Sequence, residues 1–283
     1  MARKNNHFPI VRSGRMDQTG PLQAEVEVNI EQFISKTNRR LYRQGRVYDV
    51  KLDIDADASI TYDVFALSDS WMNQRAFKMA YDMYLENSED ERDRLKGQNI
   101  ARWEDFRVVS GTDHLQMNPV QYSTLLAPVQ LTAGEFALTL VGDAAGAFKN
   151  FSWGPTTGSR YSMLEEYDKA GDAQTSPSTA TGDMPYDTLM ADDNATVASA
   201  LQTRGNSPPY DATGVSQANQ WVKVATLSAG ASQKLSTGFF KAPCGIVIIV
   251  DPAGASLGSA IGKVQWSVKS GDYKGVHAPS MLE

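Results

Sequence analysis

The chain changes its hydrophobic period abruptly between Asn29 and Leu67, and this change constrains the fold more than any other feature. Asn29 is a suitable helix N-cap, and Gln32 lies where it can return the capping hydrogen bond. Gly45 is a natural C-terminal stop. Between these residues one apolar stripe recurs at helical spacing, formed by Ile30, Phe33, Ile34, Thr37 and Leu41. The sequence therefore predicts an amphipathic helix from Asn29 to Gly45.

A strand pattern follows this helix without a break. Apolar residues alternate with charged ones from Tyr48 to Ile54, as in a half-buried strand. Residues 55–59 are typical of a turn, and the alternation resumes from Ile60 to Ala66. We therefore expect the helix to lead directly into an antiparallel pair of strands.

The polar side of the predicted helix is basic. It carries Lys36, Arg39, Arg40 and Arg43, and Arg46 follows the helix. Such cations bind phosphates through charge and counterion release, without reading the base sequence. The alternative is a solvated helix face, which is a common place for charged residues.

The net charge of −6 conceals a basic N-terminal region. Through residue 51, ten basic residues stand against five acidic ones, so the remainder of the chain is acidic. An acidic body discourages non-specific binding of nucleic acid over most of its surface. Any contact with a polyanion is therefore expected in the N-terminal region.

Composition excludes several classes of protein. The hydrophobic content of 41% suffices for a real core, and no stretch approaches the roughly 18 apolar residues of a membrane span. The N-terminus carries charge without the apolar stretch of a secretory signal. The single cysteine, Cys244, excludes an intrachain disulfide and fits a reducing compartment.

Most of the chain is expected to be β. Residues 1–28 are predicted to be a flexible arm with an edge strand over 23–28, and residues 29–283 one domain. A second helix is expected after Asp69 or Ser70, with a restart at residues 88–95. Residues 158–214 are predicted to be loop excursions, with a small helix near 194–202. Further strands are predicted over 103–109, 122–131, 135–141, 221–227, 238–242, 245–250 and 263–269. Short strands with Gly and Pro turns indicate an antiparallel sandwich.

One catalytic motif matches the sequence, but the residues around it do not fit its structural context. Residues 254–258 fit the nucleophile elbow G-x-S-x-G around Ser256, and Asp272 and His277 follow in triad order. A nucleophile elbow needs a helix after the serine, but here a strand pattern follows. A loop of small residues is the simpler interpretation, and we expect no enzyme activity.

The sequence contains no complete metal-binding motif. Asp53, Asp55 and Asp57 open like an EF-hand loop, but the required glycine and glutamate are absent. The histidines are scattered. We expect no cofactor and no metal site, with calcium between subunits left as an open alternative.

Three runs resemble the capsid proteins of small circular Rep-encoding single-stranded DNA viruses of the environmental or marine type. They are residues 35–51 (SKTNRRLYRQGRVYDVK), 238–247 (GFFKAPCGIV) and 271–276 (GDYKGV). The resemblance implies a mainly β chain with a single eight-stranded antiparallel jelly roll, two inserted or flanking α-helices and long surface loops. It also implies self-assembly into an icosahedral shell around the genome.

The resemblance implies partners as well. They are other copies of the chain and a packaged nucleic acid, with single-stranded DNA favoured, in a virion assembled inside the host cell, in cytoplasm or nucleus. The host receptor is not specified, and no membrane is implied. Such proteins commonly begin with a long basic arm, whereas the first twenty residues here hold four basic groups. We therefore place the genome contact on Lys36, Arg39, Arg40, Arg43 and Arg46, assisted by Arg3, Lys4, Arg12 and Arg15.

Two other functions remain open at this point. A carbohydrate- or ligand-binding jelly-roll module of a fibre or adhesion protein would expose Trp153, Trp221 or Trp266 in a groove. A serine hydrolase would depend on Ser256.

Overall fold

The computed structural model describes residues 9–17, 25–56, 61–89, 93, 104–110, 139–142, 148–157, 160–172, 220–228, 233–250 and 261–283. In this part the protein is mainly β, with antiparallel sheets and few helices. The helices are α1 (Ile30–Asn38), α2 (Trp71–Asn87) and α5 (Met163–Asp172). The strands are β1 (Ser13–Asp17), β2 (Glu25–Asn29), β3 (Val47–Ala56), β4 (Thr61–Leu67), β5 (Leu140–Gly142), β6 (Phe148–Ser152), β7 (Arg160–Ser162), β8 (Trp221–Ser228), β9 (Gln233–Pro243), β10 (Ile246–Val250) and β11 (Ile261–Val268).

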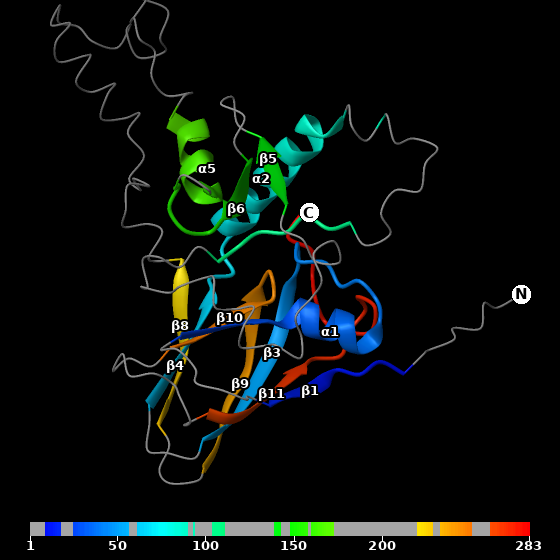
Figure 1. The fold of residues 1–283 in the computed structure, drawn as a ribbon, viewed down its shortest axis with the longest axis vertical. Helices are drawn as coiled ribbons and strands as arrows, with labels where there is room; N and C mark the ends of the chain where they lie inside the picture. The colour runs from blue at the N-terminus through cyan, green and yellow to red at the C-terminus, as the bar shows by residue number, and fades with distance from the viewer. Residues whose placement is uncertain are drawn as a thin grey trace, which may run out of the picture.

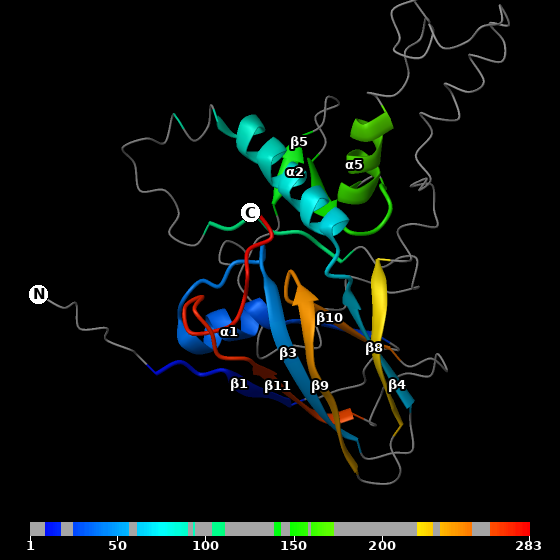
Figure 2. The same cartoon turned by 180° about the vertical axis from the view of Figure 1, so that it is seen from behind.

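Two four-stranded sheets form a sandwich (Figures 1 and 2). The first has the strand order β1-β11-β3-β9, and the second has the order β2-β10-β4-β8. Every pairing within them is antiparallel. A third, small sheet of β5, β6 and β7 lies with α2 and α5 at one end of the sandwich (Figure 1).

The prediction that residues 48–54 and 60–66 form an antiparallel pair is wrong. β3 pairs with β11 and β9, whereas β4 pairs with β10 and β8 in the other sheet. Alternation identified the buried side chains correctly, since Tyr48, Leu52 and Val64 are all buried. A period of two fixes which face of a strand is apolar, but it does not fix which strand lies beside it.

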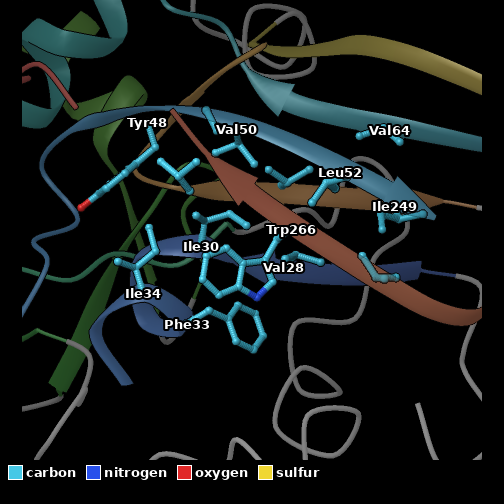
Figure 3. Packing of buried hydrophobic residues seen from close by; sticks show 14 of the residues in the cluster. Val28, Ile30, Phe33, Ile34, Tyr48, Val50, Leu52, Val64, Ile249 and Trp266 are labelled. Carbon is cyan, nitrogen blue, oxygen red and sulfur yellow. The ribbon is translucent and has the colours of Figure 1, made fainter. Parts of the chain in front are cut away.

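The apolar stripe of α1 packs into the core between the sheets. Ile30, Phe33 and Ile34 are buried, in one hydrophobic cluster with residues of β3, β4 and β10. Figure 3 shows these three side chains beside Trp266 of β11. The rings of Phe33 and Trp266 are stacked with centroids 6.2 Å apart. The predicted stripe is therefore confirmed over the first two turns of the helix.

Strand β10 separates two cores. Its sequence, IVIIV, has four buried residues and a fifth that is half-buried. Val247 and Ile249 belong to the core between the sheets, whereas Ile246 and Ile248 belong to a second core with Phe77 of α2 and other aromatic residues. A continuous apolar run is what a strand covered on both faces requires.

Helix α2 begins as predicted. The Ser70 hydroxyl accepts a hydrogen bond from the Asn73 backbone N–H, so Ser70 is the N-cap. Phe77 and Ala80 are buried, and the rings of Tyr81 and Tyr84 pack against Phe106. This apolar face covers the end of the sandwich.

Two segments contain more structure than the sequence suggested. Ser13–Asp17, within the expected flexible arm, pairs with β11 along five residues, and Gly14 lies directly against the Trp266 ring. Within the expected loop region 158–214, β7 and α5 form. Both segments lack a clear apolar period, so backbone pairing and tertiary contacts decide their structure.

Some of the remaining predicted strands and helices are confirmed, and others lie outside the described residues. The edge strand β2 and the strands β8, β10 and β11 are confirmed, and β9 begins at Gln233, before the predicted start at Gly238. Of the strand predicted over 135–141, β5 includes the last two residues. Residues 104–110 run without a named strand, with one bridge from Val109 to Ser152. The strand over 122–131, the helix near 194–202 and most of the restart at 88–95 lie outside the described residues.

Candidate nucleic-acid interface

Four of the five predicted basic residues follow helix α1, and Lys36 lies in its last turn. The prediction that the helix continues to Gly45 is wrong, because α1 ends at Asn38 and Arg39 adopts the left-handed conformation, with φ of 48°. The Arg40 N–H then donates to the Ser35 carbonyl at 3.0 Å, which closes the last turn. Arg40, Arg43 and Arg46 therefore belong to residues 39–46, here called the cationic loop.

Buried tyrosines and a serine anchor the cationic loop. The Tyr42 ring is fully buried, and its backbone N–H donates to the Ser35 hydroxyl at 2.8 Å. The Tyr48 hydroxyl donates to the Arg43 carbonyl at 2.6 Å. The loop backbone is thus fixed, while the side chains of Arg39, Arg40 and Arg43 remain exposed.

The C-terminal segment packs against the cationic loop. The guanidinium carbon of Arg46 lies 3.5 Å from the centroid of the Tyr273 ring, and the Tyr273 hydroxyl accepts a hydrogen bond from the Arg43 N–H at 3.1 Å. The Lys274 ammonium donates to the Leu41 carbonyl, and the Tyr42 hydroxyl donates to the Lys274 carbonyl at 2.9 Å. These contacts bring a further cation, Lys274, to the loop.

The N-terminal segment reaches the same place. The Asn38 side chain donates to the Val11 carbonyl and accepts from the Val11 N–H, both at 2.9 Å. The Arg12 guanidinium donates to the Gly275 carbonyl at 3.4 Å. Three parts of the chain therefore meet in what we call the cationic cluster: Arg12, Arg40, Arg43, Arg46 and Lys274.

The cationic cluster concentrates positive charge. Burial lowers the pKa of Lys274, and the charges of Arg40, Arg43 and Arg46 lower it further. Within the part of the chain that the structure describes, none of the five cations forms a salt bridge. Like charges held together repel one another, so an anion that bridges several of them gains most from binding here.

The structure brings together three of the five predicted contact residues, namely Arg40, Arg43 and Arg46. Lys36 in the last turn of α1 and Arg39 at its C-cap are exposed and precede this group along the chain. Among the expected helpers, Arg12 joins the cluster, Arg15 lies exposed on β1, and Arg3 and Lys4 lie outside the described residues.

Sequence reasoning missed Lys274 and Tyr273. They lie more than two hundred residues from the cationic loop, and no local pattern links them to it. Their only signal is the run GDYKGV, in which a tyrosine and a lysine are placed between two glycines.

The residues of the possible serine triad do not come together in the described part. His277 Nδ1 lies 3.0 Å from Asp49 Oδ2, and the Lys269 ammonium lies 3.6 Å from the same oxygen. Asp272 is exposed, and Ser256 lies outside the described residues. His277 thus has a different carboxylate partner from the one that the triad order suggested.

The aspartates of the EF-hand-like run and the single cysteine were also considered as candidate site residues. Asp53 lies in β3 and forms an ion pair with Lys51 at 3.2 Å, and Asp57 lies outside the described residues. Cys244 is buried, and its Sγ lies 3.8 Å from Met281 Sδ. Burial raises the pKa of the Cys244 thiol well above its usual value, so Cys244 serves as a small buried hydrophobic residue.

Among the described helices, none is long and apolar enough to cross a membrane. Searches against protein-family models, curated proteins and solved structures found no match.

Proposed function

We propose that this chain is a viral capsid protein that self-assembles into an icosahedral shell and encloses a single-stranded nucleic acid. The cationic cluster carries the proposal, because it concentrates five positive groups that have no salt-bridge partner among the described residues. Such a site suits a polyanion bound through its phosphates.

The strand order supports a jelly roll, and hence this class of protein. The sandwich contains β1, β2, β3, β4, β8, β9, β10 and β11, which can be numbered one to eight in chain order. The two sheets then have the orders 1-8-3-6 and 2-7-4-5. A chain folded as two interlocked Greek keys, as in jelly rolls, would have these orders, which supports the proposal.

The inserted elements agree with the same proposal. Helix α1 lies between the second and third of these strands, and residues 68–220, with α2 and α5, lie between the fourth and fifth. Insertions between strands keep the sandwich intact and provide surface for contacts. A jelly roll alone does not specify a function, so the proposal of a capsid rests on the charged site.

A ligand-binding jelly-roll module receives less support. It required an exposed tryptophan groove, but Trp153, Trp221 and Trp266 are 0%, 5% and 2% exposed. Trp71, at the start of α2, is exposed, yet it lies on a helix and not on a sheet face. These three tryptophans therefore serve the two cores.

Expression of the full chain tests the proposal. Size-exclusion chromatography and negative-stain microscopy would detect closed particles, and ultraviolet absorbance before and after nuclease treatment would measure enclosed nucleic acid. We expect uniform closed particles with nuclease-protected nucleic acid. A monomer that persists across pH, salt and calcium would contradict the proposal and favour the binding module.

A further inference from the structure

Two carboxylates, those of Glu31 and Asp105, meet the Arg107 guanidinium in a buried group beside the cationic loop. Arg107 Nη2 donates to Glu31 Oε1 at 2.6 Å, and Arg107 Nη1 lies 3.8 Å from Asp105 Oδ2. Glu27 Oε2 accepts a hydrogen bond from the Ser110 hydroxyl at 2.5 Å. We call Glu31, Asp105 and Arg107 the buried acid cluster. Its charges are unbalanced, because one guanidinium faces two acids.

Glu31 and Glu27 connect two other elements to residues 104–110, here called the linking segment. Glu31 belongs to the first turn of α1 and Glu27 to β2, whereas Asp105, Arg107 and Ser110 belong to the linking segment. Arg107 is 3% exposed and Glu31 0%. The ion pair is therefore shielded from water, where the loss of hydration opposes the charged state.

Gln44 ties the linking segment to the cationic loop. Its side-chain oxygen accepts from the Val108 N–H at 2.7 Å, and its side-chain nitrogen donates to the Val108 carbonyl at 3.1 Å. Its own backbone N–H donates to Asp105 Oδ2 at 2.9 Å. The position of the cationic loop thus depends on the linking segment.

The opposite side of the linking segment joins the small sheet. The Val109 N–H donates to the Phe151 carbonyl at 3.0 Å, and the Trp153 N–H donates to the Val109 carbonyl at 3.1 Å. Arg107 N–H donates to the Thr139 hydroxyl at 2.8 Å. A change in the position of the linking segment would consequently affect both the cationic loop and the small sheet.

The surroundings of Glu31 oppose its charge. Burial raises the pKa of Glu31 to about 7 even though Arg107 lowers it. Glu31 Oε2 has no hydrogen-bond partner in the described structure, and the Asp105 charge adds to the upward shift. The other titratable groups within electrostatic reach, Tyr48 and Cys244, stay neutral, because burial raises both pKa values well above their usual range.

The other two acids behave in the same way. Burial raises the pKa of Asp105, against the opposing charges of Arg107 and Arg43. Burial also raises the pKa of Glu27, against hydrogen bonds from Ser110 and Asn29. As the pH rises, the negative charges of Glu31 and Asp105 therefore accumulate around the Arg107 guanidinium in a site closed to water.

We propose that the buried acid cluster is a pH-responsive clasp that holds the linking segment against the cationic loop at acidic pH and opens as the pH passes neutrality. This inference rests on the proposed function, because opening of the clasp would alter how the cationic cluster holds nucleic acid. In the closed state, uncharged acids also leave the positive charge of Arg43 less opposed by its neighbour Asp105.

The sign of the effect follows from linkage. A carboxyl group whose pKa is higher in the closed state stabilises that state fully below its ordinary value of 4.5. The stabilisation is lost as the pH rises towards 7. For one proton the opening equilibrium grows up to about tenfold per pH unit in this window and levels off above it.

Hydrogen exchange on the full chain tests the clasp without nucleic acid. Peptides that cover the linking segment are compared with peptides from β3 at about pH 5.5 and 7.5, after correction for intrinsic exchange. We expect lower protection in the linking segment than in β3, because opening is local. We also expect a loss of more than about tenfold between the two pH values. Protection that is independent of pH, or equal to that of β3 at both values, overturns the clasp.

The variant Glu31→Gln isolates one acid, since it keeps an oxygen for Arg107 and cannot ionise. It should reduce the pH-dependent loss by about tenfold or more, whereas the same substitution at the exposed Glu86 of α2 should leave the loss unchanged. If Glu31→Gln does not fold, the ¹³C titration of the Glu31 carboxyl in the unaltered chain replaces it. A titration midpoint near the ordinary 4.5 overturns the clasp.

Binding of a single-stranded DNA oligonucleotide separates the two proposals. We expect affinity on the order of threefold higher at the lower pH in the unaltered chain, with no such difference in Glu31→Gln. DNA binding at unchanged affinity overturns the regulatory role of the clasp. If exchange follows the expected course but the oligonucleotide does not bind at either pH, the proposed function fails instead.

Discussion

Arg46 and Tyr273 join the cationic loop to the C-terminal segment, with the Arg46 guanidinium carbon 3.5 Å from the ring centroid. The same ring meets the edge of Tyr42, with centroids 5.9 Å apart. A cation over an aromatic face is attracted by the ring quadrupole. The pair therefore holds the cationic loop against the C-terminal segment at the place where charge repulsion would separate them.

Removal of the Tyr273 ring should loosen this contact. Tyr273→Ala loses the cation contact, the aromatic pair and the hydrogen bond from Arg43, and should lower the free energy of unfolding by about 2 kcal/mol. Tyr273→Phe keeps the ring and should cost about 1 kcal/mol or less. Urea unfolding of the protein measures both. Equal losses in the two variants would show that the ring contact contributes nothing.

Asn38 should control the N-terminal segment. Asn38→Ala removes both hydrogen bonds to the Val11 backbone, and each such bond contributes about 1 kcal/mol. Cleavage by trypsin after Arg12 should become about fivefold faster or more, because the segment opens more often. Asn87→Ala, at the exposed end of α2, is the matched control. Cleavage at the same rate in both variants would show that the hydrogen bonds of Asn38 do not hold the N-terminal segment in place.

The free energy of unfolding should fall as the pH rises from 4.5 to 7. The pKa of Glu31 is raised to about 7 by burial, so up to about 3 kcal/mol of stability present at the lower pH is lost over this window. Urea titrations at intervals of pH measure the change, and Glu31→Gln should flatten it. A stability that rises over the same window would contradict the assigned sign.

Asp63 has the opposite effect at lower pH. Burial raises its pKa, but the hydrogen bonds from Thr226 and Lys223 outweigh burial and the net shift is downward. Its contribution is therefore present above its ordinary value of 3.8 and is lost as the pH falls below it. The two effects together place maximal stability on the acidic side of neutrality.

Ile248 should contribute strongly to the second core, which it shares with Phe77 of α2. Ile248→Ala in β10 leaves a cavity against α2 and Trp153, and should cost about 2–5 kcal/mol. Val222→Ala, on the exposed edge strand β8, should change stability by less than about 0.5 kcal/mol. Thermal unfolding compares the two. A small loss of stability in Ile248→Ala would mean that the packing of α2 and the small sheet does not depend on β10.

Local patterns predicted the elements better than their partners. The alternation in β3 and the apolar run of β10 identified strands and buried faces, because burial leaves its period in the sequence. The pairing of β3 with β9 and β11 depends on the whole chain. The short turn after β3 suggested a hairpin, although the next strand crosses to the other sheet.

The candidate site was predictable only in part. Arg40, Arg43 and Arg46 are close in sequence, so they were found although the predicted helix was wrong. Lys274 comes from the far end of the chain and has no local signal. Glu31 resembles an ordinary acidic residue in a first helical turn, and only the arrival of Arg107 from a distant segment shows that it is buried and paired.

The nucleic-acid content of charge-neutral variants tests the central claim most directly. The variant Arg40→Gln, Arg43→Gln, Arg46→Gln is compared with Arg75→Gln, Lys78→Gln, Lys234→Gln, which removes the same charge from α2 and β9. Nuclease-protected nucleic acid per subunit is measured in purified particles by absorbance. We predict closed particles from both variants and clearly less nucleic acid in the first alone. Equal nucleic acid in the two variants would contradict a genome contact at the cationic cluster.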